Sequence, residues 1–324
     1  MNDHQPPSEP PLHLAVVGAG RRGLLTALAA RKSFAAHEFA LLDAAPQPGG
    51  DDLTRRSNGF GCELGAIGLW PDELAAFAEH LAPLPPRLAL DPAAANGALW
   101  DGERLHPCPV DPAPATFRGG LEDLWQAARR ALGPALRLGR KVTTAARTQD
   151  GWELHLGGEV PTVVAARELT LALPVDAAVE LLAPYDPALG EVAARLRRRT
   201  QALVYLGDRS EAGAAVPGYG IAAHPDLPDP LREVVHCSRA FAPRAMAGRC
   251  LLRCELVLDE AEPSDERLVG LARERLAAWL GSPLPDFGFT LVHRRAELVR
   301  DGAYAECKLR LQALPDRVGS LRLA

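Results

Sequence analysis

A glycine turn near the N-terminus constrains this chain more than any other feature. Residues 14–17 form a short apolar run, and Gly18, Gly20 and Gly23 follow it at once. In this spacing the first glycine allows a tight turn, the second lets a diphosphate approach the backbone, and the third lets a helix pack closely on the strand. The Ala- and Leu-rich segment 24–29 predicts that helix. The pattern therefore predicts a strand–helix–strand unit that binds a dinucleotide.

An acidic residue completes this pattern. The apolar strand predicted over 39–42 ends on Asp43, which falls 20 residues after Gly23. A carboxylate at this place can accept hydrogen bonds from both ribose hydroxyls, while the diphosphate lies at the helix N-terminus. The competing interpretation is a glycine-rich turn that binds no ligand. The placement between two predicted strands favours the dinucleotide site.

Composition narrows the classes of function. The 324 residues carry a formal net charge of −5, so no overall positive field favours nucleic acid or an anionic membrane as a partner. The six cysteines form no CxxC pair, and we expect no metal site. No apolar run reaches the roughly 18 residues of a membrane span. We expect a cytoplasmic protein with a small-molecule substrate, and its oligomeric state stays open.

The rest of the chain predicts further helices and strands. Residues 1–12 are polar and Pro-rich, which indicates a flexible tail rather than a signal peptide. Apolar spacing predicts helices over 71–81, 118–133, 264–280 and after Pro174, and strands over 141–146, 152–156, 169–173, 203–206, 220–223, 233–238, 250–258 and 289–293. Prolines interrupt 83–114, so a loop is expected there. The arginine run 195–199 is interpreted as a solvated helix end.

These elements predict an α/β fold class with two domains. The dinucleotide-binding domain would combine 13–70 with 117–183, and optionally 300–324. A shortened helical and loop insertion would occupy 71–116, and a mixed-sheet α+β domain of the kind that binds substrate would occupy 184–299.

A second glycine pair carries a resemblance to a known family. GAGRRG followed by LLDAAPQPGG puts Gly49 and Gly50 six and seven residues after Asp43. This arrangement resembles the FAD-binding opening of the flavin amine oxidase superfamily. The segments that follow are similar, in the same order, to those of protoporphyrinogen oxidases: 58–69, 98–109, 117–132, 141–156, 169–182 and 218–256.

The resemblance implies a Rossmann-like FAD-binding domain (GR2-type) beside the substrate-type sheet domain. It implies an oxidoreductase that holds FAD without a covalent bond and transfers a hydride from a C–H or N–H substrate to the flavin. No catalytic residue follows from it. The cofactor-binding residues that it implies are Gly18, Ala19, Gly20, Arg22, Gly23, Asp43, Gly49, Gly50, Gly65 (toward the flavin) and Val142 (toward adenine).

Two alternatives stay open. Only a short connection joins Pro109 to Phe117, where the family has most of its helical substrate region, and 319–324 resembles the strand before the family's closing Gly-rich FAD motif. Asp51 and Asp52 also add negative charge beside the expected diphosphate site. These departures favour a catalytically degenerate binding or scaffold protein. The weaker alternative is an NAD(P)-dependent dehydrogenase, in which Gly49 and Gly50 would have no role.

Overall fold

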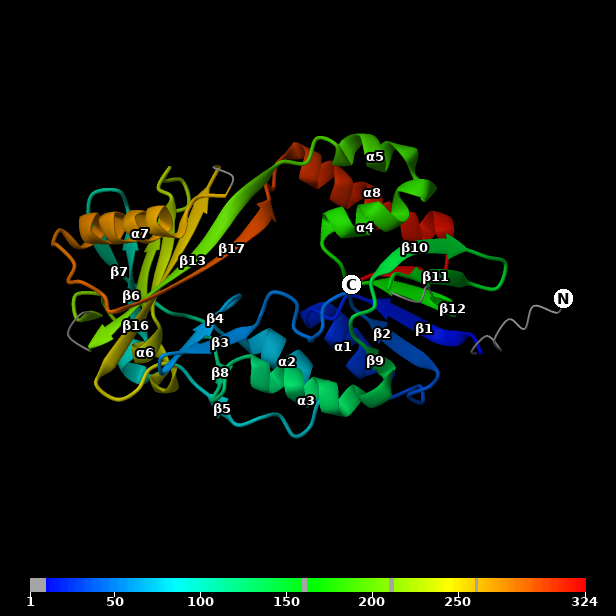
Figure 1. Ribbon diagram of the computed structural model, residues 1–324, viewed down its shortest axis with the longest axis horizontal. Helices are drawn as coiled ribbons and strands as arrows, with labels where there is room; N and C mark the ends of the chain where they lie inside the picture. Colours follow the sequence, from blue (N-terminus) through cyan, green and yellow to red (C-terminus); the bar gives the residue numbers. More distant parts are fainter. Residues whose placement is uncertain (1–9, 159–161, 210–212, 260–261) are drawn as a thin grey trace.

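The chain builds two large mixed sheets with helices packed on them. The computed structural model describes residues 10–158, 162–209, 213–259 and 262–324. Within these residues there are two seven-stranded sheets and two two-stranded ones, and the two large sheets lie at opposite ends of an elongated molecule (Figure 1). The predicted α/β fold class is confirmed.

The first sheet is built around strand β1 (Leu12–Val17). β1 pairs in parallel with β2 (Phe39–Leu42) on one side and with β12 (Thr162–Leu171) on the other. Its residues 15 and 16 are fully buried, as expected of a parallel strand covered on both faces. The strand order is β10-β11-β12-β1-β2-β9, and β18 pairs with β12. The remaining bounds are Leu136–Arg137 for β9, Val142–Arg147 for β10, Trp152–Leu156 for β11 and Leu321–Leu323 for β18.

Helices cover both faces of this sheet (Figure 1). On one face lie α1 (Arg21–Ala30), α2 (Pro71–His80) and α3 (Glu122–Leu132), which share one buried core with β1 and β2. On the other lie α4 (Val175–Leu182), α5 (Pro187–Ala193) and α8 (Gly302–Val318). The sheet thus places the glycine turn, which joins β1 to α1, at the carboxyl ends of its parallel strands.

The second sheet has the order β17-β13-β16-β15-β14-β6-β7. Helix α7 (Asp265–Leu280) packs on one of its faces. Its other face contacts the hairpin of β3 (Thr54–Ser57) and β4 (Phe60–Glu63), so the first half of the chain touches it. The strands are Asn96–Trp100 (β6), Leu105–Pro109 (β7), Arg198–Arg209 (β13), Gly220–Ala223 (β14), Leu231–His236 (β15), Arg249–Leu258 (β16) and Phe289–Leu298 (β17).

Residues 83–114 were expected to be a loop, and this prediction is wrong. They contain β6 and β7, which extend the second sheet, besides the short β5 (Arg87–Leu88), which pairs with β8 (Thr116–Phe117). Pro107 and Pro109 lie in β7, which pairs with β6 alone among the described strands and forms the edge of the sheet. An edge strand tolerates proline because one of its sides needs no backbone donor. Strands β6 and β7 fall within 71–116, the segment predicted to be an insertion, and they form the edge of the second sheet. The domain boundaries stay a prediction.

The arginine run 195–199 begins just after α5, and the side chains of Arg195 and Arg197 are 60% and 69% exposed. The start of the run is thus a solvated helix end, as predicted, whereas its last residues belong to β13. Arg198 begins β13, and Arg195 and Arg197 form ion pairs with Glu306 and Asp301, at 2.8 and 3.1 Å. The acids belong to α8 and its N-cap, and no helix had been predicted over 302–318. The periodicity of α8 is weak, because only three of its residues are buried and Pro315 lies inside it. The run therefore fastens a helix from the far end of the chain.

Candidate functional site

The glycine turn between β1 and α1 is sterically required at two of its three glycines. Gly18 has a φ of +104°, and a Cβ added there would overlap the carbonyl oxygen of Ala172. A Cβ on Gly23 would overlap the carbonyl oxygen of Gly18. Gly20 differs, because a Cβ there would meet no atom within 4 Å. Two glycines close the turn, and the middle one leaves open space in front of the helix.

The N-terminus of α1 faces this open space without a side-chain cap. Its N-cap residue is Gly20, which has no side chain that could cap the helix, and the first turn contains no acidic residue. The first N–H groups of a helix have no partner within the helix, and the helix dipole adds partial positive charge there. The end of α1 is therefore built to receive an anionic ligand.

The carboxylate of Asp43 lies beside the turn with both oxygens oriented. Oδ2 accepts a hydrogen bond from the backbone N–H of Ala19, and Oδ1 accepts one from the N–H of Ala45 at 2.7 Å. A carboxylate offers about four lone-pair sites, so each oxygen can accept a second hydrogen. Each oxygen of Asp43 therefore keeps the capacity to accept a hydrogen bond from a further donor.

Gly49 and Gly50 close the opposite side of the turn. Gly49 donates its N–H to the carbonyl of Ala19 at 2.8 Å, and a Cβ on Gly50 would lie 3.3 Å from Cα of Gly20. The φ angles of the two glycines are +115° and +62°, a region of backbone conformation that favours glycine. The indole of Trp125 packs against Gly49, where a Cβ would lie 2.5 Å from the ring.

Two adjoining cavities form one trough along these residues. The larger has a volume of about 620 Å³ and is lined by Gly18, Gly20, Asp43, Gly49 and Gly50 among others. The smaller, of about 220 Å³, is lined by Val142 and its neighbours. Gly18, Asp43 and Leu173 line both. The trough thus runs from β10 past the helix terminus toward the second sheet.

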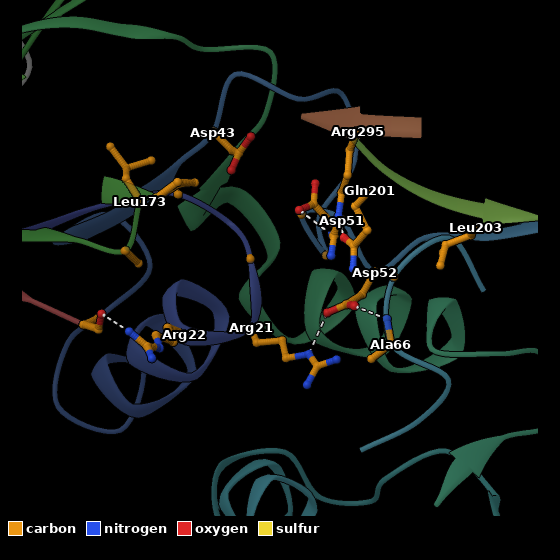
Figure 2. A pocket seen from close by; sticks show the side chains of 18 of the residues that line it. Arg21, Arg22, Asp43, Asp51, Asp52, Ala66, Leu173, Gln201, Leu203 and Arg295 are labelled. Atoms are coloured by element: carbon orange, nitrogen blue, oxygen red, sulfur yellow. Dashed lines mark hydrogen bonds and ion pairs between the residues drawn. The ribbon is translucent and has the colours of Figure 1, made fainter. Parts of the chain in front are cut away.

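The two acids that follow the glycine pair are compensated by arginines (Figure 2). Asp52 accepts a hydrogen bond from Arg21 Nε at 2.6 Å and another from the N–H of Ala66 at 2.8 Å. Asp51 Oδ2 lies 2.9 Å from Arg295 Nη1. Arg21 also pairs with Glu73 at 2.5 Å. These ion pairs offset the acidic charge in the trough, and they engage Arg21 in holding the loop.

The structure brings the expected site residues to one trough, in different roles. Arg22 is exposed at the rim and donates Nη1 to the carbonyl of Ala324 at 3.0 Å. Gly65 lines the larger cavity, and its α-carbon packs so closely on Asp52 that a Cβ would overlap that carboxylate. Ala19 and Gly23 are buried beneath the turn. Their roles in binding a cofactor stay predictions.

Sequence reasoning missed the wall that the second sheet contributes. Arg295 donates Nε to Gln201 Oε1, and Gln201 donates Nε2 to Glu255 Oε1 at 2.6 Å. Arg253 Nη2 donates to Glu255 Oε2 at 3.3 Å. All four line the larger cavity with Leu203. The available signal was a polar residue within an apolar strand, such as Gln201 in β13.

A buried ion pair lies where the β3–β4 hairpin meets η5 (Ala242–Arg244). The side chains of Glu63 and Arg244 are 0% and 1% exposed, with Oε1 and Nη2 2.9 Å apart. Nη2 also donates to Thr116 Oγ1 at 2.8 Å. Burial raises the pKa of Glu63 to about 7, although Arg244 favours its charged form. The pair therefore joins the two halves of the structure at a site where water is excluded.

Two classes of site find no support in the described segments. Within residues 10–158, 162–209, 213–259 and 262–324, no three His, Cys, Asp or Glu side chains are grouped to hold a metal ion. In these same segments, no helix combines the length and the apolar character needed to cross a bilayer.

Comparison with known proteins agrees with this geometry. A family model described as an NAD(P)-binding Rossmann-like domain matches residues 16–81, which contain the glycine turn, Asp43 and the glycine pair. The predicted Rossmann-like domain is therefore confirmed.

Solved structures of similar fold extend over nearly the whole chain. A protein from Exiguobacterium sp. 255-15, assigned as a protoporphyrinogen oxidase, is 15% identical with a TM-score of 0.77, covering 97% of this chain and 93% of that one. Cyclohexylamine oxidase from Brevibacterium oxydans IH-35A is 12% identical with a TM-score of 0.72, covering 97% and 93%. A reduced UDP-galactopyranose mutase is 12% identical with a TM-score of 0.72, covering 97% of this chain and 88% of that one. These similarities extend the agreement in fold over 97% of this chain.

Proposed function

We propose that this chain is an FAD-dependent oxidoreductase related to protoporphyrinogen oxidase. The observation that carries the proposal is the trough, which connects a β10 pocket, an uncapped helix terminus and a polar wall on a second sheet. The similar folds include two named oxidases. The proposed substrate is a small molecule that gives up a hydride from carbon or nitrogen.

The residues present fit the ADP half of FAD. The open space at Gly20 and the uncapped terminus of α1 would receive the diphosphate. Asp43 would accept the ribose hydroxyl hydrogens, and Val142 would lie beside adenine. The flavin half would extend toward Gln201 and Glu255, which line the larger cavity together with the glycine turn.

Bound FAD would supply the acceptor for a hydride, which carries two electrons. The chain's own groups would orient and shield the reactants. Gln201 has its amide fixed at both ends by Arg295 and Glu255, so it presents a defined polar edge. Leu203 adds an apolar surface beside it. The wall would thereby position a substrate without rearranging its own hydrogen bonds.

The proposal is tested by titrating the purified protein with FAD. A stoichiometric complex with the visible absorbance of bound oxidised flavin is the expected result, and quenching of flavin fluorescence gives the affinity. A protein that stays colourless and binds no flavin would refute the proposal.

Asp43→Ala is expected to weaken FAD binding by about tenfold to a hundredfold, because hydrogen bonds to a charged group contribute about 1.5–3 kcal/mol. The measurement is the fluorescence titration above. Asp91→Ala is the matched control, since Asp91 also accepts a backbone N–H, from Ala93 at 2.8 Å, but lies outside the trough. Equal losses in the two variants would contradict a ribose-binding role for Asp43.

A second candidate function is a protein that binds NAD(P) rather than FAD. The description of the matching family model favours it. Competition between FAD and each nicotinamide dinucleotide decides between them, with FAD expected to bind more tightly.

A scaffold protein without activity would bind FAD and show no turnover with any reductant. Cytoplasmic location stays a prediction.

A further inference from the structure

Two glutamates face each other across neighbouring strands in the polar wall. Glu255 on β16 stands directly opposite Glu233 on β15 in the antiparallel register. Such cross-strand pairs have Cβ atoms about 4.5–5.5 Å apart, and like charges at this place destabilise a sheet. Two ionised carboxylates would therefore repel each other here.

The nearest cation balances only one of these carboxylates. Arg253 has a side chain that is 6% exposed, and its Nη2 lies 3.3 Å from Glu255 Oε2. Its Nε and Nη1 have no hydrogen-bond partner among the described residues. Burial raises the pKa of Glu233, Arg253 opposes this rise, and the charge of Glu255 adds to it. One carboxyl group of the pair therefore tends to keep its proton.

Other titratable or charged groups face the pair from every neighbouring strand. Arg295 is engaged by Asp51 and Gln201, and burial followed by Arg295 lowers the pKa of His293. Burial raises the pKa of Tyr205 well above its usual range, so that its hydroxyl stays neutral. The remaining groups are Tyr219, beside β14, and Cys237, which follows β15; burial raises the pKa of both. The carboxyl groups of Glu255 and Glu233 thus face each other among groups that are either paired or kept neutral by burial, and burial favours the protonated form of Glu233.

The pair connects two separate cavities. Glu255 lines the trough, where Gln201 fixes its Oε1. Glu233 lines a different cavity of about 250 Å³, together with Trp70 and Tyr219. Trp70 is 46% exposed, so that second cavity lies near solvent. The two opposed glutamates therefore line different cavities, Glu255 the trough and Glu233 a cavity at the surface.

We propose that Glu255 accepts the proton released by the substrate and that Glu233, the positioning residue, holds a shared proton and passes one on to the second cavity. The transfer rests on the proposed function. When the substrate is oxidised it loses a hydride and also a proton, and a Glu255 oxygen accepts this proton. Glu233 then gives its own proton to water and receives the one from Glu255. The pair returns to its starting state with one proton.

The shared proton is tested without any cofactor by infrared titration of the purified protein. We expect C=O bands of protonated glutamic acid near neutral pH from Glu63, whose pKa is about 7, and from Glu233. Glu233→Gln removes the second band and leaves the first. Glu255→Gln keeps the Glu233 band and moves its midpoint to lower pH, because the repelling charge is gone. Glu297→Gln is the matched control: Glu297 lies on β17 at 3.1 Å from Arg199, outside the trough. A spectrum that Glu233→Gln leaves unchanged, or an unmoved midpoint of the Glu233 band in Glu255→Gln, overturns the shared proton.

The acceptor role is tested on FAD-loaded protein by counting protons taken up per two electrons during reduction with dithionite. Reduction adds negative charge to the pocket, so the parent protein is expected to take up as much as one proton more than Glu255→Gln. Glu297→Gln should match the parent. Equal uptake in parent and Glu255→Gln overturns the acceptor role. If no FAD binds, the proposed function and the acceptor role both fail, while the infrared titration still decides the shared proton.

Discussion

Arg244→Met is expected to lower the free energy of unfolding by about 3–5 kcal/mol, the usual cost of removing one partner from a buried ion pair. Glu63 would remain in a site where its side chain is 0% exposed, with Thr54 Oγ1 donating to its Oε2 at 2.8 Å. That neutral donor cannot balance the carboxylate charge. Urea denaturation monitored by tryptophan fluorescence measures the loss.

The loss should depend on pH, with a sign that follows from the raised pKa of Glu63. In the folded protein this pKa is about 7, above its ordinary 4.5. Stability from protonated Glu63 is therefore full below about 4.5 and falls as the pH rises through 7. Without Arg244 the carboxylate is still less favourable. We expect the deficit of Arg244→Met to be largest above pH 7 and to shrink toward acidic pH.

Two further variants separate the ion pair from general packing. Adding Glu63→Gln to Arg244→Met should recover part of the stability at alkaline pH, because no charge remains buried. Arg249→Met is the matched control: its guanidinium stacks on Phe60 and donates to Asn58 O at 3.2 Å near the surface, so a loss below about 1 kcal/mol is expected. A deficit that does not vary with pH would contradict the role assigned to Glu63.

The geometry of the glycine turn and of Asp43 could be predicted from sequence because its determinants are local. Gly18, Gly23 and Asp43 belong to one strand–helix–strand unit. A side chain at either glycine would overlap a backbone carbonyl oxygen, and Asp43 accepts a backbone N–H of the same unit. The wall of the second sheet has no local signal. Gln201 and Glu255 meet only because β13 pairs with β16 in one register, and residues more than 50 apart in sequence cannot be registered from hydrophobic patterning alone.

The acids after the glycine pair show the same limit. From the sequence, Asp51 and Asp52 add negative charge beside a diphosphate site. In the structure Asp51 pairs with Arg295, 244 positions away, and Asp52 pairs with Arg21. Arg21 lies in the glycine turn itself, but the direction of its side chain depends on how α1 packs. Similarly, β7 contains prolines that locally indicate a loop, and only its edge position explains why it is a strand.

Three glycine-to-alanine variants are expected to separate folding from cofactor binding. Gly23→Ala places a methyl group against the carbonyl of Gly18, and such overpacking costs about 1–3 kcal/mol; it should lose both stability and FAD affinity. Gly20→Ala meets no protein atom within 4 Å and has a φ of −73°, which alanine adopts. It should keep its stability and lose FAD affinity by at least about tenfold, because the methyl group occupies the space of the diphosphate.

Gly190→Ala completes the comparison. Gly190 lies in α5, where a Cβ would also meet nothing within 4 Å, and alanine stabilises a helix by about 0.5–1 kcal/mol relative to glycine. It should bind FAD like the parent and unfold at a slightly higher temperature. Thermal unfolding and FAD titration of all three variants give the two readouts. If Gly20→Ala bound FAD as tightly as the parent, the diphosphate would not pass in front of α1, and the proposed path of the cofactor would be wrong.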